Sequence, residues 1–99
     1  MKISNKHHWS DEEKKLISRH YINEYVLKPV GCKNEVFLTR IYCLFPEIKE
    51  SSIKMFVQNT KQLTKEFGVA DSSTFSPLRN YSVAHKRIMT NLLKEYKLI

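Results

Sequence analysis

Apolar side chains recur every three or four residues over most of the chain, a period typical of α-helices that bury one face. The first such stretch follows Ser10 and Glu13, whose spacing is that of a capping box and predicts a helix beginning at Asp11. Proline does not propagate a helix easily, so Pro29 should end it. A short break then separates the first helix from the second.

Two further helices are predicted on either side of a short turn. The apolar pattern indicates a second helix over residues 35–45, which Pro46 forces to stop. After the connection PEIKE, the segment SSIKMFVQNTKQLTKEFG is expected to form a third helix, with Ser51 or Ser52 as its N-cap and Gly68 at its end. The pattern therefore predicts a helix, a tight turn and a helix.

The last third of the chain predicts a loop and a fourth helix. Residues 69–79 are rich in Ser, Thr and Asp, which is typical of a loop. Asn80 or Ser82 can cap the helix that follows. An apolar stripe on this helix must cover either the first three helices or a second copy of the chain. The stripe consists of Ala84, Ile88, Met89, Leu92, Leu93 and Tyr96.

The third helix is expected to have two different faces. At 100° per residue, one side carries four polar residues within roughly 60° of one another. These residues are Lys54, Gln58, Lys61 and Lys65, with Asn59 and Gln62 alongside. The far side carries Ile53, Phe56, Val57, Thr60, Leu63 and Phe67. We expect the apolar side to pack in a core and the lysine side to face solvent.

The charge balance suggests a use for this row of lysines. The chain of 99 residues has 17 Lys and Arg against 10 Asp and Glu, which gives a net charge of +7. The summed field should attract polyanions, a class that includes nucleic acid, acidic proteins and anionic lipid. Lysines are also an ordinary means of keeping a helix face solvated, so charge alone does not choose among these alternatives.

The segment around the PEIKE turn resembles the helix-turn-helix family. In that motif a small residue of the first helix allows close approach, an apolar residue occupies the turn, and two apolar positions of the second helix close the core. The residues at the matching spacing are Cys43, Ile48, Ile53 and Phe56. Glu47 departs from the pattern of many bacterial members, which have glycine there, and suits the looser tri-helical variety better.

The start of the chain is similar to the opening of Myb/SANT-like domains, in which a tryptophan precedes a capped acidic turn. The likeness is carried by Trp9, Ser10, Glu12, Glu13 and Leu16. Myb/SANT-like domains are three-helix bundles whose third helix enters the major groove, although the later tryptophans of Myb repeats are missing here. With the helical pattern, the resemblance implies an all-α single domain, a three-helix helix-turn-helix bundle with an additional C-terminal helix. Its parts would be a basic N-terminal arm (1–9), a tri-helical core (10–68), a loop (69–79) and the C-terminal helix (80–99).

This interpretation predicts a DNA-binding site on the helix 51–67. Lysine side chains would bind phosphates, whereas side-chain amides offer a donor and an acceptor to base edges. Serines at the start of the helix could hold another phosphate through their hydroxyls and the free backbone N–H groups. The predicted DNA-binding residues are Ser51, Ser52, Lys54, Met55, Gln58, Asn59, Lys61, Gln62 and Lys65.

Other kinds of site are not expected. Zinc needs three or four ligands at suitable spacing, which the histidines and cysteines do not provide. Cys32 and Cys43 should be free thiols in a reducing compartment, and Cys43 is expected on the buried side of its helix. With 2 glycines in the whole chain, a glycine-rich phosphate loop cannot form. We therefore predict no enzyme activity, no metal and no cofactor.

The sequence contains no run of about 18 apolar residues and no secretory signal, so we expect no membrane partner and a cytoplasmic location, with the nucleoid if the protein binds DNA. The leading hypothesis is a small bacterial or phage regulator or accessory factor that binds double-stranded DNA. The alternative is a protein-binding module, such as a phage or mobile-element inhibitor that docks on an acidic surface of a host enzyme. A homodimer through the C-terminal helix stays open, as does binding to RNA.

Overall fold

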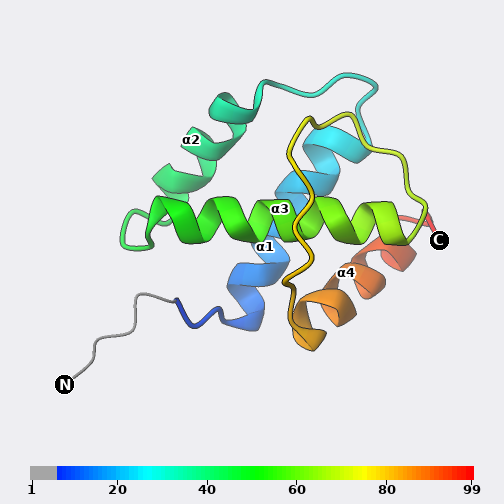
Figure 1. Ribbon diagram of the computed structural model, residues 1–99. Coiled ribbons are helices and arrows are strands. Elements are labelled where there is room, and N and C mark those ends of the chain that lie inside the picture. The colour runs from blue at the N-terminus through cyan, green and yellow to red at the C-terminus, as the bar shows by residue number, and fades with distance from the viewer. Residues whose placement is uncertain (1–6) are drawn as a thin grey trace.

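The computed structural model describes residues 7–99, and within that range the chain is all-helical, with no strand (Figure 1). The elements are α1 (Asp11–Tyr21), the π-helical turn η1 (Ile22–Val26), α2 (Asn34–Leu44), α3 (Glu50–Glu66) and α4 (Val83–Glu95). The predicted all-α class is confirmed for these residues. Much of the predicted N-terminal arm, residues 1–6, lies outside the described range.

The capping box predicted from Ser10 and Glu13 fixes the start of α1. The Ser10 hydroxyl accepts a hydrogen bond from the Glu13 N–H at 3.1 Å, and the Glu13 carboxylate accepts one from the Ser10 N–H at 2.9 Å. These reciprocal bonds satisfy N–H groups that a helix start otherwise leaves free. α1 continues without a break into η1, where the Leu27 N–H donates to the Ile22 carbonyl at 2.9 Å.

A short connection joins α2 to α3, and the two helices pack against each other. Ile48 lies in this connection and is buried at 5% exposure, which ties the turn to the core. The N-cap of α3 is Lys49, which makes no side-chain capping bond. The expectation that Ser51 or Ser52 caps the helix is therefore wrong, because α3 starts before both of them.

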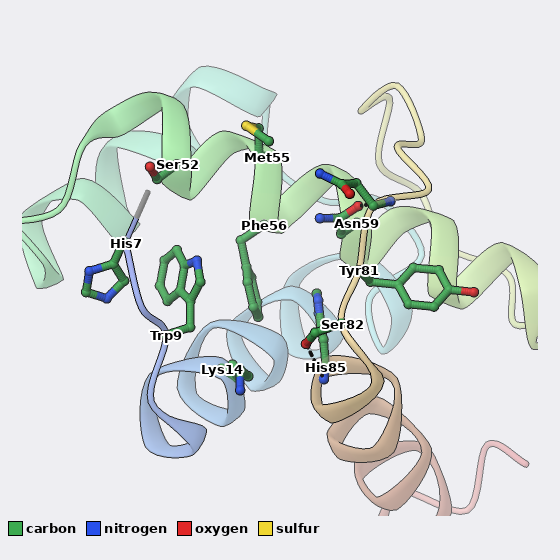
Figure 2. Close-up of a pocket in the computed structure, with 11 residues that line it drawn as sticks. His7, Trp9, Lys14, Ser52, Met55, Phe56, Asn59, Tyr81, Ser82 and His85 are labelled. Atoms are coloured by element: carbon green, nitrogen blue, oxygen red, sulfur yellow. Dashed lines mark hydrogen bonds between the residues drawn. The ribbon is translucent and has the colours of Figure 1, made fainter. Parts of the chain in front are cut away.

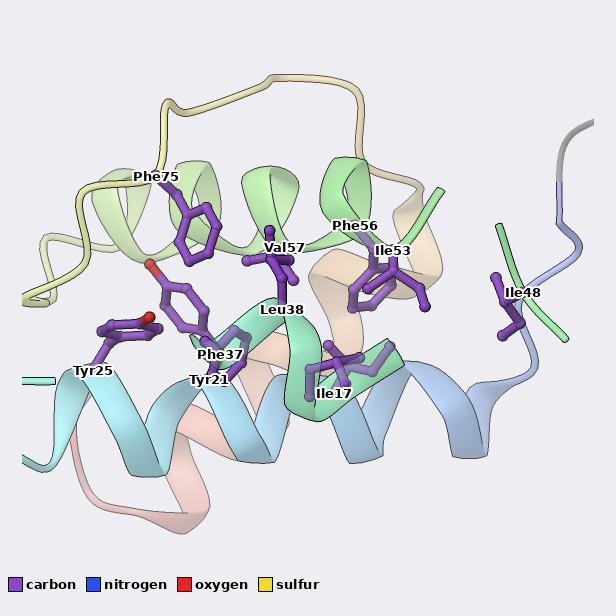
Figure 3. Packing of buried hydrophobic residues seen from close by; sticks show 11 residues of the cluster. Ile17, Tyr21, Tyr25, Phe37, Leu38, Ile48, Ile53, Phe56, Val57 and Phe75 are labelled. Carbon is purple, nitrogen blue, oxygen red and sulfur yellow. The ribbon is translucent and has the colours of Figure 1, made fainter. Parts of the chain in front are cut away.

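The first of two apolar clusters lies between α1, η1, α2 and α3 (Figure 3). Aromatic rings fill much of it: Tyr25 and Phe37 meet at a centroid distance of 5.2 Å, and Phe75 packs edge-on against Tyr25 at 5.9 Å. The cluster contains Ile17, Tyr21, Tyr25, Phe37, Leu38, Ile41, Ile48, Ile53, Phe56, Val57 and Phe75. Its members from α3 confirm the side of that helix predicted to be buried.

The second cluster forms where α4 covers α1 and α3. Ser82 caps α4 by accepting a hydrogen bond from the His85 N–H at 3.0 Å. It is one of the two residues predicted as caps. The cluster contains Ile22, Leu63, Ile88, Met89, Leu92 and Leu93, so the central part of the α4 stripe is buried within the chain. A second copy would have to bind the polar side of α4 rather than this stripe.

The segment between α3 and α4, residues 69–82, has no regular secondary structure and passes across α3 (Figure 1). We call this segment the strap. Phe75 of the strap is 4% exposed and belongs to the first cluster. The Ser73 hydroxyl, also in the strap, lies 2.6 Å from the Tyr21 hydroxyl of α1. The predicted loop is therefore packed into the body of the molecule.

Candidate nucleic-acid interface

The first turns of α3 are the most open part of the predicted recognition helix. Ser51 and Lys54 are exposed, and Met55 is 41% exposed beside them. Lys54 forms no ion pair with any residue that the structure describes. Ser52 and Gln58 are half-buried at the margins of this surface. The start of α3 thus offers a cation, hydroxyls and an amide to a ligand.

Asn59 does not lie on this open surface. It is 7% exposed, and its Oδ1 accepts a hydrogen bond from the Asn80 N–H of the strap at 2.8 Å. Nearby, the Leu78 N–H of the strap donates to the Gln58 carbonyl at 3.2 Å. The expectation that Asn59 faces solvent is wrong, because the strap covers the middle of α3.

Lys61 is held inside the chain by the strap. Its ammonium lies 2.7 Å from the Asp71 carboxylate and donates to the Ser73 carbonyl at 3.0 Å. The Asp71 side chain is 3% exposed and also accepts from the Thr64 hydroxyl at 2.5 Å. Burial raises the pKa of the Asp71 carboxyl, but the bonds from Lys61 and Thr64 outweigh it and hold that pKa below its usual value. The expectation of a free Lys61 ammonium is therefore wrong.

The last turns of α3 lie beyond the strap. Gln62 donates to the Glu66 carboxylate at 2.9 Å, and the same carboxylate pairs with Arg79 of the strap at 3.2 Å. Lys65 is exposed, with no ion pair to a residue in the range 7–99. At 1.5 Å per residue it lies about 16 Å along the helix from Lys54. The strap therefore separates the exposed Lys54 at the start of α3 from the exposed Lys65 at its end.

Two hollows flank the start of α3. The smaller, about 220 Å³, lies between α2, α3 and the strap, with Lys54 and Gln58 in its wall. The larger, about 250 Å³, lies between the N-terminal segment, α1, α3 and the start of α4 (Figure 2). We call the larger hollow the aromatic cleft, because Trp9, Phe56 and His85 line it. The open surface of α3 therefore stands between two concave regions.

A row of four rings runs along the aromatic cleft (Figure 2). Trp9 contacts His7 and Phe56 at centroid distances of 4.7 and 4.8 Å. Phe56 stacks on His85 at 3.9 Å, with 9° between the two planes. Burial, with a smaller contribution from the Lys14 ammonium, lowers the pKa of His85 to about 3. The His85 ring is therefore neutral at pH 7.

The aromatic cleft has no clear signal in the sequence. The helical pattern places Phe56 in the core and Trp9 before the first helix, and it predicts no role for His85. The three rings come from segments far apart in the chain, and only the packing of α4 against α1 and α3 brings them together. The available signal was the single tryptophan of the chain, which directly follows two histidines.

Both cysteines are free, as predicted. Cys43 is exposed rather than buried, because α2 turns the side that carries Phe37 and Ile41 toward the core. Within residues 7–99, no three His, Cys, Asp or Glu side chains gather as a metal site would require. The cysteines thus take no part in the surface at the start of α3.

In comparisons with models of protein families, with curated proteins and with solved structures, no match to the chain was found. The helices within residues 7–99 are too short or too polar to span a lipid bilayer.

Proposed function

We propose that the chain is a non-enzymatic DNA-binding protein, a small regulator or accessory factor that presents the start of α3 to the major groove of double-stranded DNA. The observation that carries this proposal is the exposed Lys54 ammonium, which has no ion-pair partner among the described residues and lies near the start of a helix that follows a short turn. In helix-turn-helix proteins the N-terminal residues of the recognition helix contact base edges. The strap leaves the first turns of α3 open, and a contact of this kind uses those turns.

The proposed contact uses fewer groups than the sequence predicted. Lys49 and Lys54, both exposed, would bind phosphates, while the Ser51 hydroxyl and the Gln58 amide would reach the backbone or base edges. If the two lysines and the N–H groups at the helix start each neutralise one phosphate, the slope of log K against log salt is about −2.7. Affinity should then fall about 40-fold between 50 and 200 mM salt.

A salt series with a random-sequence duplex tests this proposal. We expect Lys54→Ala to weaken binding and to shallow the slope by about 0.9, the loss of one phosphate contact. Lys94→Ala is the matched control, because it removes an equal charge from an exposed position on α4. Fluorescence anisotropy of a labelled duplex gives both slopes. Equal effects of the two substitutions would contradict a contact at α3.

A protein-binding module is the second candidate, and exposed apolar side chains on the outer side of α2 favour it. Val36 is 50% exposed and Leu44 is 46% exposed, and both are on a helix that packs against α3 on its other side. An acidic partner protein could combine these apolar contacts with the basic charge of the chain. Absence of duplex binding by the parent chain at 50 mM salt would favour this candidate over DNA.

A further inference from the structure

The aromatic cleft has the size and lining of a small binding site. Its volume of about 250 Å³ equals that of roughly eight water molecules in the liquid, which exceeds what one or two structural waters need. Lys14 supplies a cation to its wall, but the Lys14 ammonium pairs with Asp11 at 3.2 Å, and His7 of the wall contacts the Glu13 carboxylate at 3.0 Å. Because the charges at the wall already have partners, the lining favours a neutral ligand.

Asn59 presents a fixed hydrogen-bond donor to this cleft. Because the Asn80 N–H can only donate, the side-chain atom that faces it at 2.8 Å must be the oxygen, which fixes the orientation of the Asn59 amide. The Asn59 NH2 group then makes no hydrogen bond with any described residue, although the side chain is 7% exposed and lines the cleft. Among the described residues the Ser18 hydroxyl is the one fully buried side-chain nitrogen or oxygen without a partner, so the Asn59 nitrogen is open to the cleft, where water or a ligand can accept its hydrogen bond.

His85 offers an acceptor in the same cleft. The Thr60 hydroxyl uses its single proton to donate to the Phe56 carbonyl at 2.9 Å, so it must accept from His85 Nε2, 3.0 Å away. Nε2 therefore carries the proton of the neutral ring, and Nδ1 is left as an acceptor. Nδ1 makes no hydrogen bond within residues 7–99, and His85 is 2% exposed. The cleft thus combines one free donor and one free acceptor.

We propose that the aromatic cleft binds a nucleobase, with the Asn59 NH2 group and His85 Nδ1 at its polar edge and the ring of Trp9 along its face. Bases carry donors and acceptors side by side in one plane, and they pack readily on aromatic side chains. This proposal deepens the proposed function and rests on it for the source of the base.

A nucleobase can come to the cleft from two sources. One is an unpaired or extruded base of a nucleic acid held at the start of α3, because Ser52 and Met55 belong both to that surface and to the lining of the cleft. The other is a free mononucleotide. The two sources are distinguished by comparing free dAMP with an oligonucleotide that carries one unpaired adenine.

Trp9 provides a direct signal, because it is the single tryptophan of the chain and lines the cleft. We expect dAMP, or a duplex with one bulged adenine, to change Trp9 fluorescence in a saturable manner. Ribose 5-phosphate and the same duplex with an abasic bulge have the phosphates without the base, and they should leave the signal nearly unchanged. An equal response to the probes without a base, or no response to any probe, would overturn the proposal.

Asn59→Asp tests the donor while keeping the oxygen that accepts from Asn80. The affinity measured from the base-dependent Trp9 response should fall about tenfold, as expected for one lost hydrogen bond to a ligand. Asn91→Asp makes the same change at an exposed position of α4 and should have little effect. If thermal unfolding shows that Asn59→Asp is not folded, Met55→Glu replaces it, because this residue is 41% exposed at the cleft and its new carboxylate would repel a nucleotide. Unchanged affinity in the folded variant would contradict the assignment.

Failure of this proposal and failure of the proposed function can be separated. Salt-dependent binding to a fully paired duplex without any base-dependent Trp9 response would leave the DNA-binding proposal standing and remove the nucleobase site. A Trp9 response to dAMP in a chain that ignores duplex DNA at 50 mM salt would do the reverse and assign the cleft to a free nucleotide.

Discussion

The ion pair between Lys61 and Asp71 ties the strap to α3, and its removal has a calculable cost. The Asp71 carboxylate accepts from Lys61 at 2.7 Å, from the Thr64 hydroxyl at 2.5 Å and from the Ser73 N–H at 3.0 Å. Asp71→Ala would leave the Lys61 ammonium, whose side chain is 19% exposed, without its partner. Breaking a buried pair costs about 3–5 kcal/mol, and the residual exposure of Lys61 favours the lower end, about 3 kcal/mol. For a chain of this length, the melting temperature should fall by about 12 °C.

Thermal unfolding followed by circular dichroism at pH 7 measures this cost. Glu47→Ala is the matched control, because it removes an exposed carboxylate that forms no ion pair within the described residues, and it should change stability by less than about 0.5 kcal/mol. Combining Asp71→Leu with Lys61→Met should recover part of the loss, because no unpaired buried charge remains. A loss below about 1 kcal/mol for Asp71→Ala would refute the anchored strap.

Two further predictions concern stability. His85 has a usual pKa of 6.5 that burial lowers to about 3, so below pH 6.5 the unfolded state takes up a proton that the folded state does not. The free energy of unfolding should therefore fall with falling pH by up to about 1.4 kcal/mol per pH unit in that window. Urea titrations at several pH values measure this slope. His85→Gln should lose it, whereas the control His8→Gln should keep it. Gly68 has a φ of 69° with no described atom near the position of an added Cβ, so Gly68→Ala should cost about 1 kcal/mol in the same titrations, from backbone strain alone. An unchanged free energy of unfolding in Gly68→Ala would contradict the left-handed turn at the end of α3.

Local signals predicted much of the fold. Ser10 with Glu13, and Ser82, mark helix starts that depend on hydrogen bonds within one turn of the chain. The serines that suit a cap predict too late a start for α3, which begins at Glu50, directly after the buried Ile48 and the N-cap Lys49. Burial in the core is a tertiary effect that capping rules do not contain.

The candidate site was predicted less well, and the reason lies at the borders of the α3 faces. At 100° per residue, Asn59 stands about 40° from Leu63 and Lys61 about 40° from Val57, so both are neighbours of buried positions. Whether such border residues face solvent depends on what covers the helix. The strap covers them here, and the sequence signal for it was Asp71, the one acidic residue of the strap. Lys54 stands about 60° from Val57 and is exposed as predicted.

The most direct test of the central claim is amide chemical-shift mapping by NMR while a random-sequence duplex is added at 50 mM salt. The proposed interface predicts the largest shifts at residues 49–58, at the start of α3, with small shifts along the far side of α4. Shifts concentrated on α4 or on the outer side of α2, or no shifts at all, would contradict a DNA contact through α3.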